Sequence, residues 1–503
     1  MELMNHLRLN MEEFEGVVQQ IKELAESSVR SGTAMHIVEQ NLLDKLLQLG
    51  HAAIHAMFLS FGSGDVGTTV THADHPKPLK RFPELSNRSY RSVFGDFQLA
   101  RYVYGKTPKQ KAIVIPLDEH FALPPNDYSL LLESWVTQIA TSEAIHEGVD
   151  KLHRIFGIAV AVDSAERILK RTGANAEHFQ DDLPILEAEA EGELLVESTD
   201  NKGIVMRRPL SVAPKPVGAP ADRSGPISNR KQMATVCGCY SVDRFVRTPV
   251  EVLDALFRDT NPRDVSPKRP RPQQARYQAC MSCDQAHPED SLNGEISAIA
   301  WLSEHVEQRR RDNQVLINLN DGEVSIWSNI ERSQGQNDRV DVLDLIHGIQ
   351  RVWDAAEILS PMDKVRFAKS HIKSILQGKV KSVIRSFRWK STHLALTTKQ
   401  RQKIATICGF LTRNADRMRY DDYLSKGYPI ASGFIEGACR HLVKDRMERS
   451  GMRWSIQGAQ HMLYFRCIDA ASLWKDFMST HQTRTLSHYG ERRNFNDAIQ
   501  LAA

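Results

Sequence analysis

Beyond residue 192, short apolar runs alternate with helical segments, and this order limits the folds that the chain can adopt. The expected strands cover residues 193–200, 203–209, 233–242, 315–320 and 340–345. Amphipathic helices are expected over residues 296–310 and 324–330, and a long helical stretch over residues 348–425. Strands that are first consecutive and then separated by helices predict an α/β domain.

Three acids lie where this element order could bring them together. Asp200 ends the first expected strand, Asp321 follows the strand 315–320, and Glu436 lies in the last helix. Three strands, a helix, a strand, a helix, a strand and a final helix is the order of a ribonuclease H-like fold, in which those three places converge. Taken singly, Asp200 and Asp321 also fit plain turns or a helix cap. Their joint agreement with one fold favours a shared site.

The helix that carries Glu436 has clear start and stop signals. Ser432 favours a helix start and Gly451 a helix end. Residues four apart share a face, so Glu436, Arg440 and Lys444 align. The side chains expected to point inward are Ile435, Cys439, Leu442 and Val443. A carboxylate backed by cations suits a metal ligand that faces a polyanion, although a solvated amphipathic helix has the same pattern.

Carboxylates from separate elements are the ligands that hard divalent cations prefer. Two such ions about 3.5–4 Å apart can stabilise both the attacking and the leaving oxygen of a phosphodiester displacement. We therefore predict that Asp200, Asp321 and Glu436 bind two Mg²⁺ or Mn²⁺ ions and are the catalytic residues.

The net charge of +3 averages two opposed segments. Residues 364–403 contain 12 Lys or Arg and no acid, whereas residues 180–200 contain eight acids and no base. A solvated basic face could explain the first segment, but its length favours a surface that meets a polyanion such as nucleic acid.

The N-terminal half is mainly helical in pattern. Residues 11–60 predict helix, used in a bundle or for dimerisation, and residues 62–89 resemble a linker. Residues 90–104 predict a hairpin that breaks at Gly95. A helix over 128–156 and a second one ending at Gly173 predict a helix-turn-helix-like pair, although an ordinary helical pair fits equally.

The bulk properties indicate a cytoplasmic protein that does not enter a membrane. No apolar run approaches the roughly 18 residues of a membrane span, and the N-terminus does not resemble a signal peptide. Seven cysteines, an odd number, suit a reducing compartment. Cys280 and Cys283, with His287, have only part of the spacing of a zinc site, so zinc is a weak expectation.

Several motifs together are similar to those of one known family. They are Pro116-Leu-Asp-Glu119, Thr199-Asp-Asn-Lys-Gly-Ile-Val-Met206, Lys231-Gln-Met-Ala-Thr-Val236, Asn320-Asp-Gly322, Leu343-Asp-Leu-Ile-His347, Gly427-Tyr-Pro-Ile-Ala-Ser-Gly-Phe-Ile-Glu-Gly437 and Arg446-Met-Glu-Arg-Ser-Gly-Met-Arg-Trp-Ser455. Over residues 90–470 the chain resembles bacterial insertion-sequence DDE transposases of the ISKra group, relatives of the mutator-like superfamily. The chain departs from the family before Pro116, where a Cys-containing pair is absent. This departure makes a zinc-stabilised N-terminal module doubtful.

The resemblance implies a transposase that binds the terminal inverted repeats of its element and cuts and joins DNA. It implies Asp200, Asp321 and Glu436 as the metal-binding triad, and double-stranded DNA, a homodimer or larger homo-oligomer, and a bacterial, nucleoid-associated location. The expected accessory residues near DNA are Asp344, His347, Arg440, Lys444, Arg446 and Trp454. His347 could instead cap the fifth strand, and Trp454 could be a packed core residue.

The resulting domain plan has six parts. They are an N-terminal helical region (1–61), a DNA-binding region (90–175), the first part of the catalytic core (192–347), a basic α-helical insertion (348–430), the last helix of the core with its Trp motif (431–470) and a C-terminal tail (471–503). Two rival functions remain compatible with the residues: a domesticated, catalytically silent DNA-binding protein, and a ribonuclease H-like nuclease that cuts branched DNA without joining strands.

Overall fold

The computed structural model describes nine stretches of the chain, which form two compact units. The described residues are 11–72, 75–107, 112–183, 191–207, 231–258, 268–282, 293–335, 338–449 and 451–489. The first unit comprises described residues up to 175 and from 475 onward, and the second comprises those from 176 to 474. Within these stretches, no helix combines the length and the apolar character needed to cross a membrane.

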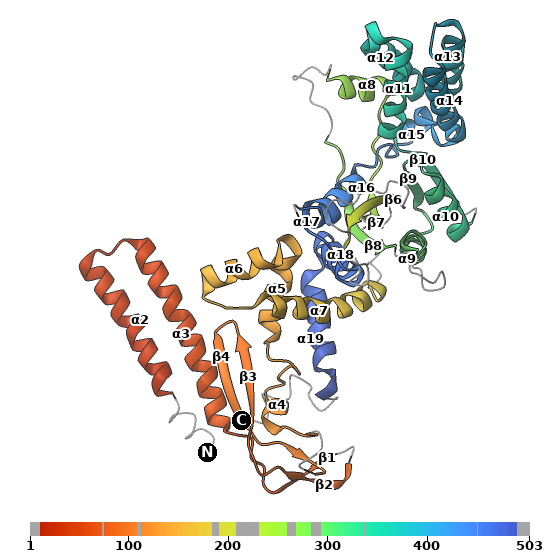
Figure 1. Ribbon diagram of the computed structural model, residues 1–503. Coiled ribbons are helices and arrows are strands. Elements are labelled where there is room, and N and C mark those ends of the chain that lie inside the picture. The colour runs from red at the N-terminus through yellow and green to blue at the C-terminus, as the bar shows by residue number, and fades with distance from the viewer. Residues whose placement is uncertain are drawn as a thin grey trace, which may run out of the picture. The chain divides into compact units, whose positions relative to one another are not determined.

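The first unit begins with a helical hairpin of α2 (Glu12–Ser31) and α3 (Met35–Phe61), as Figure 1 shows. Gly32 ends α2 in the left-handed conformation, with φ of 63°, which costs glycine little. The predicted helical character of this region is confirmed.

The expected linker over residues 62–89 was wrong. It contains β1 (Thr69–His72) and β2 (His75–Arg81), which form a three-stranded sheet with β5 (Tyr104–Gly105). The prolines of β2 lowered its strand signal, yet pairs such as Val70–Leu79 complete the ladder.

The predicted hairpin is present as β3 (Ser86–Ser92) and β4 (Gly95–Arg101), but it begins before residue 90 and turns between Ser92 and Gly95 rather than at Gly95. A short helix, α4 (Pro116–His120), packs beside it and supplies Asp118. This buried carboxylate accepts hydrogen bonds from Arg88 of β3, at 2.7 Å, and from Arg101 of β4. The motif Pro116–Glu119 therefore holds this part of the first unit together.

Three helices replace the expected helix pair. They are α5 (Leu130–Ser142), α6 (Ile145–Phe156) and α7 (Val162–Asp181). The first expected helix is interrupted, because α5 ends at Ser142 and α6 begins at Ile145. The second expected helix, α7, continues through Gly173, where it was expected to end. Burial of Ile168 and Ala176 on either side supports this turn of helix despite the low helix propensity of glycine.

The C-terminal tail also contributes a helix, α19 (Trp474–Leu486), to the first unit. His481 of α19 lies with its Nε2 atom 3.5 Å from the buried carboxylate of Glu133 in α5. Asn175 of α7 contacts the other ring nitrogen of His481 at 2.9 Å. The tail helix is thus anchored to the helices of the expected DNA-binding region.

The second unit is built on a five-stranded mixed sheet. Its strands are β6 (Leu194–Val205), β7 (Lys231–Val242), β8 (Gln273–Met281), β9 (Val315–Asn320) and β10 (Arg339–Leu343). Their order across the sheet is β10-β9-β6-β7-β8. β7 is antiparallel to β6 and β8, whereas β9 is parallel to β6 and to β10.

Two strand predictions were wrong. β6 does not end at Asp200 but continues to Val205, and it pairs with β7 along its whole length, so residues 203–205 belong to β6 rather than to a separate strand, whereas residues 208 and 209 lie outside the described residues. The third strand of the sheet is β8, in a segment where no strand was predicted. Arg276 and Gln278 are buried in β8, and these polar residues concealed the apolar alternation of a strand.

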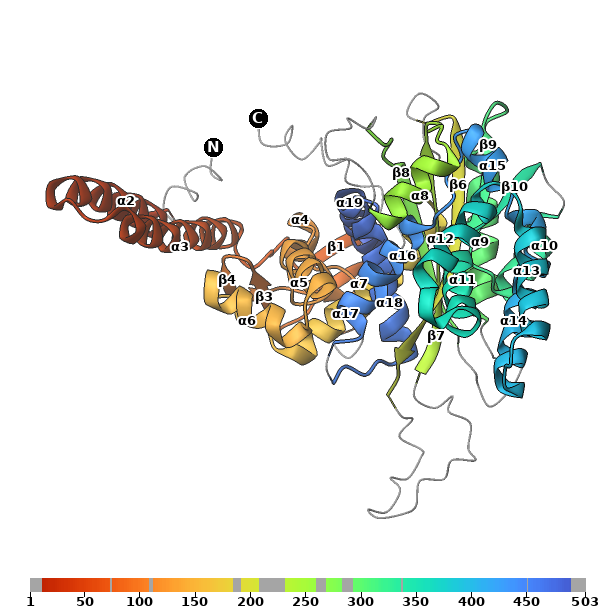
Figure 2. The same cartoon turned by 90° about the horizontal axis from the view of Figure 1, so that it is seen from above.

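Helices cover both faces of the sheet. α9 (Gly294–Arg309) packs on the face that presents Leu195, Cys237 and Leu316. α10 (Val324–Gln334) packs against α9. Among the described residues, a large hydrophobic core joins the opposite face, with Leu194 and Ile317, to the helices that follow β10. Figures 1 and 2 show the course of these helices after β10.

The segment expected to be a helical insertion is helical. Its elements are α11 (Leu345–Leu359), α12 (Lys364–Leu376), α13 (Val380–His393), α14 (Thr398–Arg413) and α15 (Tyr420–Ser425). α8 (Pro249–Phe257), which follows β7, packs against α12. After the insertion, α16 (Gly433–Ala438) returns the chain to β6 and β7, and α18 (Ile456–Ala470) lies against β8.

Candidate metal centre at the carboxyl ends of the parallel strands

The parallel strands place three aspartates in line. The register pairs Glu197 of β6 with Asn318 of β9, and Asn318 with Asp341 of β10. Three residues further along each chain segment come Asp200, Asp321 and Asp344. Because side chains alternate along a strand, these aspartates belong to the face opposite that of Glu197. The carboxyl ends of β9 and β10, and the middle of β6, therefore form an acidic edge.

Asp200 stays in the ladder with β7, opposite Val236, and its side chain is half-buried. It lies on the face that α16 covers, where Phe434 packs on Tyr240 with ring centroids 4.4 Å apart. The thiol of Cys439, just after α16, interacts with the Asp200 carboxylate, and burial raises the pKa of that thiol. Asp200 therefore faces the segment that carries Glu436.

Asp321 is held in place through its neighbours. The side chain of Asn320 accepts a hydrogen bond from the backbone N–H of Thr199 at 2.5 Å, which ties the end of β9 to β6. The carbonyl oxygen of Asp321 accepts from Trp327 Nε1 at 2.6 Å. A Cβ at Gly322 would lie 2.1 Å from the ring of Phe410 in α14, so this glycine is required for close packing rather than for a turn.

Asp344 is a buried N-cap whose two oxygens are occupied. One oxygen accepts from the backbone N–H groups of Ile346, at 2.6 Å, and His347, at 3.3 Å, at the start of α11. The other accepts from the N–H of Ser432, at 2.5 Å, and from its hydroxyl. Ser432 directly precedes α16, so Asp344 joins the end of β10 to the helix that carries Glu436.

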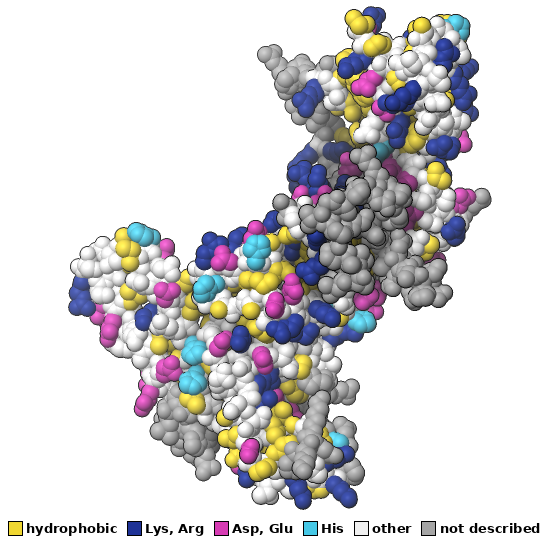
Figure 3. All heavy atoms as spheres, viewed as in Figure 1, with side chains coloured by type: hydrophobic (Ala, Val, Ile, Leu, Met, Phe, Trp, Pro, Cys, Tyr) yellow, Lys and Arg dark blue, Asp and Glu magenta, His cyan; other side chains and the backbone are white. Residues whose placement is uncertain are grey.

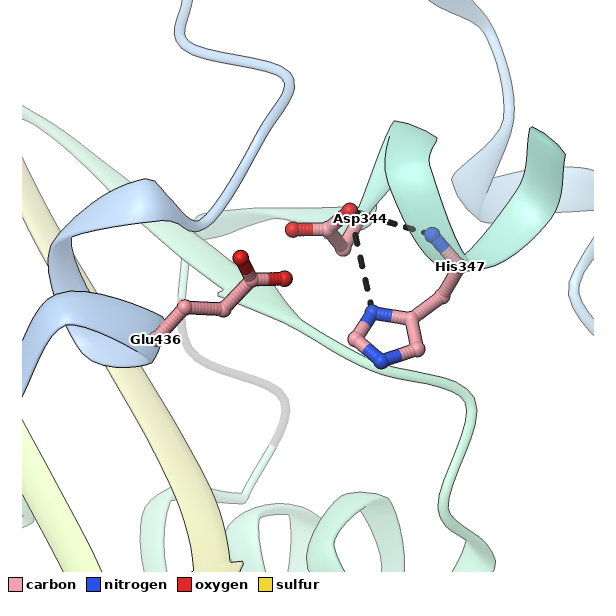
Figure 4. A group of neighbouring side chains, drawn as sticks. All are labelled: Asp344, His347 and Glu436. Atoms are coloured by element: carbon pink, nitrogen blue, oxygen red, sulfur yellow. Dashed lines mark hydrogen bonds and ion pairs between the residues drawn. The ribbon is translucent and has the colours of Figure 1, made fainter. Parts of the chain in front are cut away.

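Glu436, Asp344 and His347 point toward one another (Figure 4), and one ligating atom from each lies within 4.8 Å of the others. The compact group in the described chain is this one, rather than the predicted set of Asp200, Asp321 and Glu436. His347 Nδ1 lies 3.7 Å from Asp344 Oδ1. Asp344 and His347, which were predicted to be accessory residues, therefore lie beside Glu436.

The Glu436 helix differs from the single α-helix predicted between Ser432 and Gly451. α16 is followed by a π-helical turn, η6 (Cys439–Lys444), and a short α17 (Asp445–Met447). Insertions of this kind are frequent at functional sites. The four side chains expected to point inward are buried: Ile435, Cys439, Leu442 and Val443.

The electrostatics of the edge are those of crowded carboxylates. Burial raises the pKa of Asp321, and the charges of Asp200 and Asp344 raise it further. Burial also raises the pKa of Glu436, again with contributions from Asp344 and Asp200. The nearby carboxylate of Asp344, 3.7 Å from the ring, raises the pKa of His347. Carboxylates that resist ionisation together are stabilised by a bound cation.

Asp344 behaves in the opposite way. Although burial raises its pKa, hydrogen bonds from His347 and Ser432 outweigh this effect and leave the pKa below the ordinary aspartate value. Its lone pairs are already used within the protein, whereas those of Asp321 and Glu436 are less fully satisfied. We therefore interpret Asp344 as a positioning residue and the other acids as the better metal ligands.

The accessory residues divide into exposed and packed groups. Arg440 and Lys444 are exposed beyond Glu436, and Arg440 Nε lies 3.6 Å from Asp445. Arg446 is only 1% exposed and lies 5.0 Å from the ring of Trp454, so its expected contact with DNA is not supported. Trp454 donates to the carbonyl oxygen of Met447 at 3.1 Å and is half-buried, which favours the packed alternative.

Sequence reasoning missed Glu323 and two arginines near the site. Glu323 donates its backbone N–H to Asp321 at 2.9 Å, and burial raises the pKa of its carboxyl group, with Asp321 adding to the effect. A cleft of about 410 Å³ is lined by Asp321, Glu323, His347, Arg351 and Arg413, among others. The spacing of four between His347 and Arg351 on a helix was the signal that could have found Arg351.

The weak zinc expectation gains no support. Cys283 and His287 lie outside the described residues. Burial raises the pKa of the Cys280 thiol to about 12, which disfavours the thiolate that zinc requires. Comparison with models of protein families and with curated proteins gave no match for this chain.

Proposed function

We propose that the chain is a DNA transposase with a ribonuclease H-like catalytic domain. The observation that carries the proposal is the position of Asp200 in β6 and of Asp321 just after the neighbouring parallel strand β9, with Glu436 supplied by a helix on the same face. The sheet supports it as well. If the strands are numbered one to five along the chain, their order across the sheet is five, four, one, two, three. Strand two is antiparallel to strands one and three, whereas strands four and five are parallel to strand one. That is the arrangement of ribonuclease H-like sheets.

The donor set fits Mg²⁺ or Mn²⁺. The carboxylates of Asp200, Asp321 and Glu436 would hold the ions, because their oxygens are hard ligands and the pKa values of two of them are raised by burial and mutual repulsion. When bound, two such ions would supply charge stabilisation and an activated oxygen nucleophile for phosphodiester cleavage and joining. Asp344 would fix the start of α16 through Ser432, and so place Glu436.

The insertion offers a surface for the DNA backbone. Figure 3 shows Lys and Arg side chains gathered over α12 to α14. Lys403 lies 3.3 Å from Asp354, but several exposed cations have no carboxylate within 4 Å among the described residues: Lys364, Arg366, Lys373, Lys379, Lys381, Arg385 and Arg388. Neutralising phosphates with such cations releases counterions, so binding should weaken steeply with salt.

Recognition of the element ends is assigned to the three-helix part of the first unit. Arg167 and Lys170 are exposed on α7, whereas Arg171 is held by Glu133. Joining two ends requires at least two active sites or two bound ends, which favours a homodimer or larger assembly. The α2–α3 hairpin, with apolar side chains such as Val29 exposed, suits contacts between copies.

The test is a strand-transfer assay with full-length protein, a duplex that carries the ends of the encoding element, and Mg²⁺ or Mn²⁺. Joined product that is lost in Glu436→Gln and retained in Glu331→Gln, an exposed acid on α10, supports the proposal. Cleavage without joining would assign the chain to the nucleases. Specific binding without metal-dependent chemistry would make it a silent DNA-binding protein.

A further inference from the structure

One face of α13 combines cations with an exposed aromatic ring. Trp389 is 60% exposed, which is unusual for the largest apolar side chain. On the opposite side of the helix the side chains are buried, and they are Val380, Val383, Ile384 and Phe387. Packing within the protein therefore accounts for one face of α13 but not for the Trp389 face.

Helical spacing places three cations beside this ring. Lys381, Arg385 and Trp389 follow one another at intervals of four, and Arg388 lies three residues after Arg385, so the four side chains share a face. All four side chains are exposed, and the three cations have no carboxylate within 4 Å among the described residues. Residues 364–403 contain no acid that could pair with them.

His393 supports the ring from one side. Its imidazole stacks on Trp389 with ring centroids 4.3 Å apart and an interplanar angle of 22°. Trp389 is not part of the hydrophobic core cluster that contains Phe387. A tryptophan that is stacked on one side and exposed to solvent can accept a second flat partner.

We propose that this face of α13, defined by Lys381, Arg385, Arg388 and Trp389, binds an unpaired DNA strand. Trp389 stacks on a base, and the three cations contact the flanking phosphates. Cations alone would serve duplex DNA equally well, because they meet only phosphates. The exposed ring selects an unpaired base, since duplex bases are already covered by their neighbours.

The inference rests on the proposed function for its context, because DNA cleavage and joining expose unpaired nucleotides near the cut. It places the contact in the insertion, which also reaches the acidic edge through Phe410. Binding itself requires neither metal nor chemistry. An equilibrium binding assay can therefore test it separately from transposition.

The experiment measures fluorescence anisotropy of a labelled oligothymidine and of a labelled duplex of equal length, titrated with full-length Asp321→Asn protein without divalent ions. Trp389→Ala should weaken binding of the single strand by about 5- to 100-fold and leave the duplex nearly unchanged. Trp389→Phe should retain most of the affinity. Arg385→Ala should weaken the binding of both the single strand and the duplex, and it should reduce the salt dependence of each binding reaction.

Met362→Ala is the control for loss of an exposed apolar side chain, because Met362 is 97% exposed on the same insertion but has no aromatic ring that could stack on a base. Equal losses for strand and duplex in Trp389→Ala, or no loss for either, would overturn the inference. Circular dichroism establishes that each variant is folded. A chain that binds the strand through Trp389 but never joins DNA would refute the proposed function alone.

Discussion

Two rows of polar residues cross the same three parallel strands, three positions apart, and they differ in how their charges are satisfied. The first row is Glu197, Asn318 and Asp341, and the second is Asp200, Asp321 and Asp344. In the first row, Gln334 donates to both oxygens of Glu197, at 3.1 and 2.9 Å. Asp341 accepts from Asn318 at 3.2 Å and from Arg339 at 2.9 Å.

The second row lacks amide and guanidinium partners of this kind among the hydrogen bonds of the described residues. Asp344 is satisfied by Ser432 and by the start of α11. The carboxylate of Asp321 accepts a backbone N–H from Glu323 and lies near the charges of Asp200 and Asp344 as well as near His347. Acids whose oxygens accept side-chain hydrogen bonds have their lone pairs used within the fold. Acids that face one another without such hydrogen bonds attract cations, and from this contrast we propose which carboxylates are structural and which are functional.

Neutralising one acid in each row should have the largest effect and tests whether the two rows differ in role. Asp321→Asn should lower strand joining by about 10³-fold or more, because a group that stabilises the transition-state charge is lost. Its melting temperature should not fall, since removing one charge relieves repulsion. Asp341→Asn should do the reverse, with joining retained and unfolding made easier by about 1–3 kcal/mol.

Strand-transfer kinetics and thermal melts measured on the same preparations give both quantities. Asp312→Asn, an exposed acid at the other end of β9, is the control for charge alone. Loss of joining in Asp341→Asn without loss of stability would contradict the division into two rows.

The second prediction concerns pH and Glu197, which is fully buried. Burial raises the pKa of Glu197 from 4.5 to about 7 in the folded protein. The folded state therefore binds more protons than the unfolded state between these values, and its stability falls as the pH rises through this window. Glu197→Gln should remove the penalty, which is about 3 kcal/mol at full ionisation.

Chemical denaturation of both proteins at pH 5 and pH 8 measures this effect. The variant should gain most at pH 8 relative to the parent protein, with a smaller difference at pH 5. Glu307→Gln, an exposed acid on α9, should show no such difference. A variant whose advantage is the same at both pH values would show that Glu197 does not titrate in this range.

The sequence allowed the acids of the second row to be predicted, but not the pairing around them. Asp321 follows an apolar run that ended as expected, so its place at the strand end could be inferred, whereas the strand expected to run to residue 345 ends at Leu343, just before Asp344. β6 continued past Asp200 because the ladder with β7 compensates for turn-forming residues such as Asn201 and Gly203. Such long-range pairing leaves no local signal.

The site shows the same limit. Glu436 was found because its helix carries strong start and stop signals, whereas the link from Asp344 to Ser432 spans 88 positions of sequence and depends on the fold. Arg446 was misjudged because a cation in a basic motif resembles a DNA contact until its burial is known. Satisfied polar residues become recognisable only when their partners are in place.

The smallest expected effect concerns Ser432, which links Asp344 to the helix that carries Glu436. Ser432→Ala removes one of the donors to Asp344 but keeps the backbone N–H, so unfolding should become easier by only about 1–2 kcal/mol. Because Ser432 precedes α16, Glu436 should be held less firmly, and kcat for joining should fall by about 10-fold while DNA affinity is unchanged. Ser432→Thr, which keeps the hydroxyl, should restore much of kcat. A loss of DNA affinity with kcat retained would mean that Ser432 acts on DNA binding and that Asp344 does not position Glu436.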